Sequence, residues 1–208
     1  MKMNEQDSKI ERALRELTDP SSGELSRLQD RLVADARASG SLDVVYRLVD
    51  SPVGRLLVAA TSKGIVRVAF EIEGFDSVLS DVAAKVGPAV LRSSTELEVA
   101  AQQIDAYFDG SRHAFDLPLD DRLSAGFRQL VQRHLPQIAY GSTQTYKQVA
   151  ELVGNPGAVR AVGTACATNP LPIVVPCHRV LRTDGTIGGY LGGPDAKRTL
   201  LDLERQAA

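Results

Sequence analysis

One short motif in this 208-residue chain, Pro176-Cys177-His178-Arg179, carries side chains suited to nucleophilic chemistry. It follows an apolar run, and a proline cannot pair in a central strand, so we expect the chain to turn there and to expose the sulfur. A thiolate is the reactive form of cysteine, and a neighbouring base or cation lowers the pKa of the thiol. The alternative is a buried, unreactive cysteine, which is our interpretation of Cys166 in its run of small residues.

Two helices are predicted shortly before this motif. Thr145 is suited to cap a helix over residues 146–153, and a tight break at Gly154-Asn155-Pro156-Gly157 follows it. A helix of small residues then begins at Ala158. Helix, glycine-containing turn and helix is the outline of a helix-turn-helix, although the same outline is common in helical proteins that bind no DNA. A further helix is expected over residues 124–134, with Phe127, Leu130 and Val131 on one face.

The first half of the chain predicts a different architecture. Three runs, 44–49, 56–60 and 65–70, are separated by turns and predict an antiparallel meander. Helices are expected near 75–86 and 95–109, and a short extended stretch at 115–119. Before the meander, Ile10, Leu14 and Leu17 predict one helix and Leu25, Leu28, Leu32 and Ala36 a second, with a break at residues 19–23. We interpret these helices as a surface cap or arm, with an interaction module as the alternative.

The predicted fold class is therefore α+β, in three parts. They are an N-terminal helical extension (1–40), an N-terminal α/β domain (41–120) and a mainly helical C-terminal domain (121–208), with the boundary near 115–124. Residues 1–120 hold 14 basic and 20 acidic residues, and residues 121–208 hold 10 and 6. The respective net charges of −6 and +4 give the total of −2, which points to the C-terminal part as the one that meets a polyanion.

Composition excludes several classes of protein. Hydrophobic residues make up 43% and charged residues 24%, as in globular proteins. No apolar run approaches the ~20 residues of a membrane helix, and the charged N-terminal stretch is unlike a secretory signal, so we expect a cytoplasmic protein without membrane contact. Two cysteines are too few for a disulfide framework, and no Cys/His spacing indicates a closed zinc site. We expect neither metal nor cofactor.

The motif Pro176-Cys177-His178-Arg179-Val180 resembles the acceptor-cysteine signature of the O6-alkylguanine-DNA alkyltransferases, the methylated-DNA–protein-cysteine methyltransferases. The resemblance is strong over residues 125–205, weaker over 43–115 around Asp50-Ser51-Pro52-Val53-Gly54, and absent over 1–40. Further residues stand at the family's spacing: Tyr140-Gly141, Thr145-Tyr146, Val149-Ala150, Gly154-Asn155-Pro156, Ala158, Arg160-Ala161-Val162-Gly163, Asn169-Pro170, Gly189-Tyr190, Gly192-Gly193, Lys197, Leu200-Leu201 and Glu204.

This resemblance implies a single-turnover repair reaction and a ribonuclease-H-like N-terminal domain. The Cys177 thiolate would attack the alkyl carbon on O6 of guanine, and also on O4 of alkylthymine. The base would leave restored, and the alkyl group would remain on the sulfur as a thioether. His178 and Glu204 match the family's Cys–water–His–Glu relay, and Asn169 matches the residue that ties the active-site turn together. A carboxylate that fixes the imidazole tautomer, and an imidazole that holds the proton, would make the sulfur more nucleophilic.

The resemblance also implies how DNA is bound. The target base must leave the stack, so Arg160 would fill the vacated space and Tyr146 would help to rotate the nucleotide. The small residues of the second helix suit the narrow minor groove of double-stranded DNA. Leu191 stands where relatives have serine, so the pocket's tolerance for bulky alkyl groups is open. Further DNA or base contacts are implied for Lys147, Asn155, Val180, Thr183, Tyr190 and the backbone at Leu191.

Two other functions compete with this interpretation. A DNA-binding sensor with the same fold but without transferase activity would lack the acceptor cysteine, and Cys177 is present. A Cys-His hydrolase would need an oxyanion loop, which no segment resembles. Transfer of a labelled alkyl group distinguishes the three functions, because a transferase predicts one-to-one transfer, a sensor binding alone and a hydrolase turnover.

We expect the protein to be a monomer.

Overall fold

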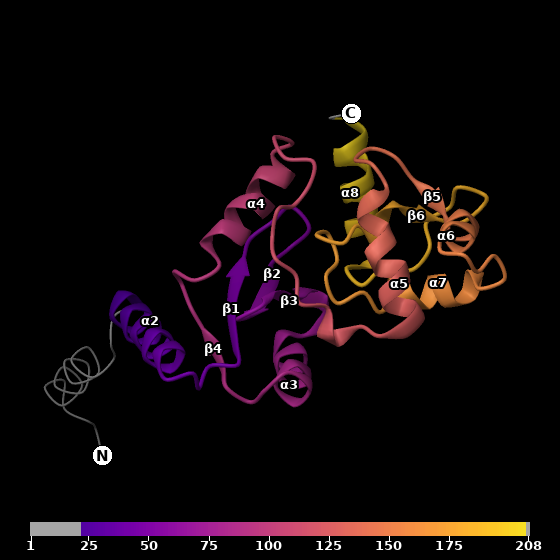
Figure 1. Cartoon of the computed structure of the whole chain (residues 1–208). Coiled ribbons are helices and arrows are strands. Elements are labelled where there is room, and N and C mark those ends of the chain that lie inside the picture. The colour runs from indigo at the N-terminus through magenta and orange to yellow at the C-terminus, as the bar shows by residue number, and fades with distance from the viewer. Residues whose placement is uncertain (1–21, 207–208) are drawn as a thin grey trace, which may run out of the picture.

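The computed structural model describes residues 22–206, and its N-terminal half is built on a four-stranded sheet of order β3-β2-β1-β4 (Figure 1). Strands β1 (Val44–Val49), β2 (Leu56–Thr61) and β3 (Gly64–Phe70) form the predicted antiparallel meander. The sequence did not predict β4 (Val90–Arg92), which pairs parallel to β1 and makes the sheet mixed. Three residues are too few to give a periodic signal, so its partner strand defines it.

Successive side chains of each strand point to opposite faces of the sheet, and each face packs against a different helix. Leu57 and Ala59 of β2 face α3 (Phe75–Lys85), which packs on one side of the sheet through Val78 and Val82. Leu56 and Val58 face the other side, where α4 (Glu98–Phe108) contributes Ala100, Ala101, Ile104 and Tyr107 to the main core. The two faces are both apolar because both are covered, which explains why β2 is buried along nearly its whole length.

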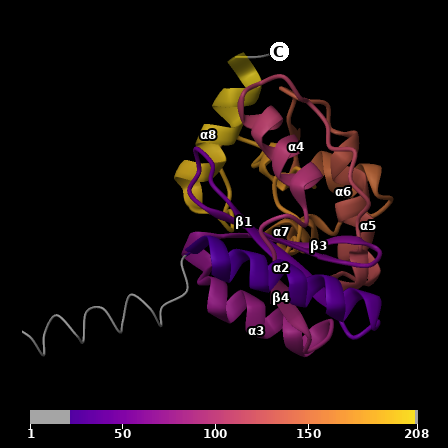
Figure 2. The same cartoon turned by 90° about the vertical axis from the view of Figure 1, so that its left-hand side faces the viewer.

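One helix precedes the sheet in the described part of the chain. Helix α2 (Ser22–Ala38) agrees with the second predicted N-terminal helix, while the first one, around Ile10, lies outside the described residues. Val33 of α2 is buried, and Asp30 accepts hydrogen bonds from Ser93 and Ser94 just after β4. In Figure 2, which views the molecule from the left of Figure 1, α2 lies in front of β4, the edge strand that it contacts, and the helices α5 and α7 lie behind the sheet.

The C-terminal half is mainly helical, as predicted. Its longer helices are α5 (Gly126–His134), α7 (Val159–Ala167) and α8 (Gly193–Gln206), and α6 (Tyr146–Leu152) with α7 forms the predicted helix-turn-helix. Its other elements are short: the 3-10 turns η2 (Asp121–Leu123), η3 (Leu135–Gln137) and η4 (Cys177–Arg179), and the parallel pair β5 (Gln144–Thr145) and β6 (Val180–Leu181). A further 3-10 turn, η1 (Glu71–Glu73), follows β3 in the N-terminal half.

Helix α5 corrects one detail of the prediction. Leu130 is 49% exposed, and Gln132 is buried in its place. Gln132 accepts a hydrogen bond from Ser124 and donates one to the carbonyl oxygen of Ala165, so a polar side chain joins α5 to α7. A buried amide with both ends paired is compatible with a core position, which apolar periodicity alone does not detect.

A single apolar core joins the two halves of the molecule. Side chains of β1, β2, β3 and α4 pack in one cluster with those of α5, α7, η4 and α8. Backbone contacts add to this junction, since the Val68 amide donates to the Pro170 carbonyl oxygen at 2.8 Å. Within the stretch predicted to be extended, 115–119, the structure has an isolated β-bridge between Leu119 and Ile65.

Candidate active site

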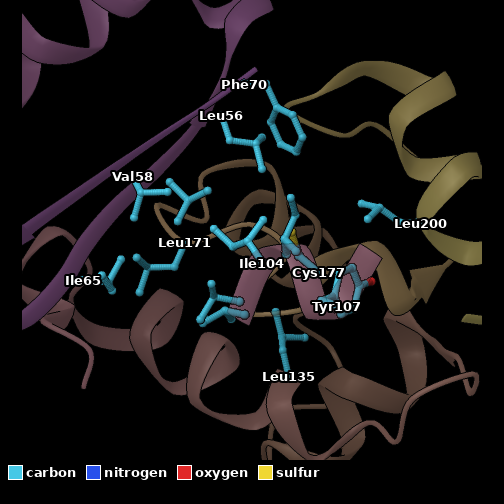
Figure 3. Close-up of a cluster of buried hydrophobic side chains, with 14 of the residues drawn as sticks. Leu56, Val58, Ile65, Phe70, Ile104, Tyr107, Leu135, Leu171, Cys177 and Leu200 are labelled. Atoms are coloured by element: carbon cyan, nitrogen blue, oxygen red, sulfur yellow. The ribbon is translucent and has the colours of Figure 1, made fainter. Parts of the chain in front are cut away.

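The Cys177 sulfur lies inside the main core. Cys177 begins η4, and the residue is 1% exposed among Ile104, Tyr107 and Leu200 (Figure 3). The expectation that the turn after Pro176 exposes the sulfur is therefore wrong for this conformation. The chain does turn there, but helices α4 and α8 pack against the turn from both halves of the molecule and cover it.

Burial also sets the protonation state of the sulfur. Removal from water raises the pKa of the Cys177 thiol to about 11, and Asn169 and Lys197 offset this only in part. A neighbouring base or cation was expected to lower the pKa, but the effect of burial is larger. The resting sulfur is thus a thiol at neutral pH. Burial also raises the pKa of Cys166, a free cysteine that is buried as predicted.

A buried imidazole–carboxylate pair begins at the residue that follows the cysteine in sequence. The Nε2 atom of His178 is 2.8 Å from Oε1 of Glu204, and both residues are at most 1% exposed. Burial lowers the pKa of His178 despite this partner, so the ring is neutral at pH 7. Its Nδ1 atom is buried and has no hydrogen-bond partner among the described residues. A neutral ring with hydrogen on Nε2 leaves Nδ1 as a free proton acceptor.

Glu204 is held as a carboxylate by donors from several segments. Arg179 donates through Nε and Nη2 at 2.9 Å, the Tyr107 hydroxyl donates at 2.7 Å, and the Gly141 amide donates at 3.2 Å. Burial alone would raise the pKa of Glu204, but the hydrogen bonds from His178 and Arg179 outweigh it and lower the pKa to about 2. A buried charge is stable here because it is fully paired.

Asn169 braces the turn that carries Cys177. Its amide nitrogen donates to the Val175 carbonyl oxygen at 2.8 Å, and its side-chain oxygen accepts from the Leu171 amide at 3.0 Å. The side chain thus closes the loop between α7 and η4 from within. Ile173, inside this loop, has a φ of 73°, a conformation that costs a branched residue energy and that the brace helps to maintain.

Three predicted site residues lie near the sulfur on other segments. Val180 is buried in β6, and its carbonyl oxygen already accepts a hydrogen bond from Lys197 Nζ at 2.7 Å. The Tyr190 ring lies edge-on to that of His178, with centroids 6.3 Å apart. Tyr146 is half-buried, and burial raises its pKa to about 12. Thr145 caps α6, as predicted, and the Gln148 side chain accepts a hydrogen bond from the Thr145 amide in return. This cap fixes Tyr146 at the first position of the helix.

The other predicted DNA contacts lie at the surface, away from this cluster. Arg160 is exposed in the first turn of α7, Lys147 is exposed on α6, and Asn155 is exposed in the turn between them. Thr183 is exposed just after β6, and Leu191 is half-buried before α8. The exposed side of α7 also presents the small residues Ala161 and Thr164. The candidate site therefore has a buried reactive part and an exposed helical part.

Comparison with known proteins places this geometry in a family. Residues 44–120 match the family model described as 6-O-methylguanine DNA methyltransferase, ribonuclease-like domain, and residues 126–206 match the DNA binding domain of the same enzyme. The chain is 40% identical over 163 residues to the methylated-DNA–protein-cysteine methyltransferase of Mycolicibacterium paratuberculosis, covering 78% of this chain and 93% of that one. This chain belongs to the 6-O-methylguanine DNA methyltransferase family.

Further relatives agree on sequence and fold. The methylated-DNA–protein-cysteine methyltransferase of Methanosarcina barkeri is 37% identical, with 76% of this chain and 96% of the relative covered. The crystal structure of Mycobacterium tuberculosis O6-methylguanine methyltransferase superposes with a TM-score of 0.71 at 36% identity, covering 79% of this chain and 94% of that one. A structure of the same mycobacterial protein in complex with DNA gives a TM-score of 0.68. Helix α2 precedes both regions matched by the family models.

Membership of this family draws attention to residues that sequence reasoning missed. Tyr107 lies in the ribonuclease-like domain, yet its hydroxyl reaches Glu204 across 97 positions of sequence. Its place on the apolar face of α4 gave no sign of this contact. Arg179 stands in the motif and Lys197 at the family's spacing, but no role was predicted for either. Both are buried beside the site, and a charged residue at 6% or less exposure is a signal that only a structure provides.

Two negative findings apply to residues 22–206. No helix there is long and apolar enough to cross a membrane. No group of three or more His, Cys, Asp or Glu side chains in that range could hold a metal ion.

Proposed function

We propose that this protein repairs alkylated DNA by direct reversal, with Cys177 as the permanent acceptor. The sulfur attacks the alkyl carbon on O6 of guanine, the S–C bond forms and the C–O6 bond breaks. The thiol proton leaves by way of His178 and the restored guanine takes up one proton, so the reaction is balanced without a cofactor. O4-alkylthymine is a second substrate of the same chemistry.

One observation carries this proposal: the cysteine of the family motif is followed by an imidazole whose Nε2 bonds a buried carboxylate and whose Nδ1 is free to accept. Glu204 fixes the tautomer, and the free nitrogen can receive the proton that a thiol with a pKa of about 11 must lose. Because Cys177 is 1% exposed, the alkylated base reaches the sulfur only after covering side chains move.

We further propose that α7 enters the minor groove of double-stranded DNA. Ala161 and Thr164 on its exposed side are small enough for a narrow groove, and Arg160 stands at its start, where it can fill the space of an extruded base. Lys147, Asn155 and Thr183 are exposed and available for backbone contacts. We assign the contacts with the flipped base to Tyr146, Tyr190, Leu191 and Val180, which match the family's pattern.

The remaining proposals concern the compartment and the oligomeric state of the protein. Both cysteines are free, and an acceptor must be a reduced thiol, which favours the cytoplasm as its compartment. We propose that the protein acts as a monomer, since Cys177, His178 and Glu204 all come from one chain.

The test is the intact mass of the protein after incubation with an oligonucleotide that contains one O6-methylguanine. We expect a gain of one methyl group per protein, located on Cys177 by peptide mapping. Cys177→Ser should lose the transfer and keep DNA binding, while Cys166→Ala, the matched buried cysteine, should still transfer. A protein that binds the oligonucleotide without gaining mass would be a sensor and not a transferase.

A further inference from the structure

The hydroxyl of Tyr107 is the point at which the ribonuclease-like domain touches the reactive groups. Tyr107 is fully buried on α4, and its oxygen is 2.7 Å from Oε1 of Glu204 and 3.4 Å from Nε2 of His178. Figure 3 shows the ring beside Cys177 in the same cluster. The contact joins the region 44–120 to the region 126–206, so one half of the molecule completes the carboxylate site of the other.

The direction of each hydrogen bond follows from the charge of Glu204. A carboxylate with a pKa of about 2 carries no proton at neutral pH, so Tyr107 must donate to it. The hydroxyl has a single hydrogen, which leaves a lone pair directed at Nε2 of His178. Two acceptors, the carboxylate and the phenol oxygen, thus face Nε2, and they favour the tautomer with hydrogen on that atom.

We propose that Tyr107 is a positioning residue that sets, through Glu204 and His178, how readily the Cys177 thiol loses its proton. This inference rests on the alkyl transfer proposed above. A donor to the carboxylate stabilises its negative charge and weakens it as a partner for a protonated imidazole. The 2.7 Å bond to the carboxylate is much shorter than the 3.4 Å contact with Nε2, so the effect on the carboxylate dominates. Tyr107 therefore holds the pair in place and moderates its basicity at the same time.

Other groups face the same atoms, so the effect of Tyr107 has to be separated from theirs. Glu204 is also faced by the charged or titratable groups Arg179, His178 and Tyr140 and by the Gly141 amide. The groups that influence Cys177 are Lys197, Asn169, Cys166, Tyr146 and Tyr190. A single hydroxyl deletion changes one donor and leaves all of these in place.

The experiment compares the pH dependence of single-turnover alkylation in wild type and Tyr107→Phe, with a saturating O6-methylguanine oligonucleotide as substrate so that the rate does not depend on DNA affinity. Over the range in which the rate rises with pH, we expect the Tyr107→Phe curve to lie about half a pH unit lower, which is about threefold faster at a given pH. The matched control is Tyr46→Phe, because Tyr46 packs in the other hydrophobic cluster, on the α3 side of the sheet, away from Glu204 and His178. Its curve should coincide with that of wild type.

A double variant shows whether Tyr107 acts through the carboxylate. In a Glu204→Gln background, Tyr107→Phe should no longer displace the curve. A Tyr107→Phe curve that coincides with wild type, or lies at higher pH, overturns the proposal, and so does a displacement that persists with Gln at position 204. Loss of folding in Tyr107→Phe overturns it as well, since it would make the hydroxyl a structural anchor. A wild-type protein that gains no alkyl group would instead refute the function itself.

Discussion

Replacing Glu204 by glutamine tests the buried carboxylate, because the change removes one charge and nearly preserves the shape. The variant leaves the guanidinium of Arg179, 6% exposed, without its counter-charge. Removing one partner of a buried ion pair typically costs about 3–5 kcal/mol. The lowered pKa of Glu204 gives a second estimate of what its charge contributes to stability. A fall of this pKa from 4.5 to about 2 corresponds to about 3 kcal/mol of unfolding free energy at neutral pH.

The pH dependence of this loss has a definite sign. The pKa of Glu204 is lower in the folded protein than in the unfolded chain, so its contribution is complete well above pH 4.5 and disappears as the pH falls towards 2. Glutamine does not titrate. The difference in unfolding free energy between wild type and Glu204→Gln should therefore shrink by about 1.4 kcal/mol between about pH 7 and about pH 3.5.

Urea unfolding of both proteins at several pH values measures this difference. The control is Asp202→Asn on the same helix, because the exposed pair of Asp202 with Arg205 should contribute less than about 1 kcal/mol. Alkyl transfer by Glu204→Gln should also slow, since His178 loses the charge that stabilises its protonated form. A loss below about 1 kcal/mol at neutral pH, or a difference that does not change with pH, would refute the view that a paired, ionised Glu204 stabilises the fold.

Three further predictions concern the reaction. Arg160→Ala should slow single-turnover repair at saturating duplex DNA far more than it slows the reaction with free O6-alkylguanine, because flipping a paired base costs a few kcal/mol. If wild type and Arg160→Ala have equal rate constants on duplex DNA, and only the salt dependence of binding becomes flatter, Arg160 is a phosphate contact. The rate of the wild-type protein should rise with pH above neutrality, since burial holds the pKa of Cys177 at about 11. His178→Ala should move this rise in rate to higher pH. Identical pH profiles of the two proteins would show that His178 does not take the proton. Asn169→Ala should destabilise the protein by about 1–3 kcal/mol, because it leaves the buried Leu171 amide unpaired and removes one of the two hydrogen bonds to the Val175 carbonyl, which keeps the one from the Cys177 amide. A change below about 0.5 kcal/mol in the urea midpoint analysis would show that the turn holds without its brace.

The sequence by itself determined the local elements and the identity of the chemistry. Apolar runs separated by turns defined the meander, Thr145 defined the start of α6, and the spacing from Tyr140 to Glu204 identified the family. These features depend on residues close in sequence or on a motif with fixed spacing, so they can be read without coordinates. The sequence did not predict the short strand β4 or the burial of Gln132, because their partners, β1 and Ala165, are remote in sequence.

Only the tertiary structure decided the state of the site. It buried Cys177 against expectation, since α4 and α8 close over the turn, and burial raised the pKa of the thiol that the motif alone suggested was lowered. It also brought Tyr107, 97 positions away, onto Glu204, and gave Arg179 its place in the ion pair. Desolvation and long-range pairing depend on what surrounds a group in three dimensions, and no sequence spacing encodes those surroundings.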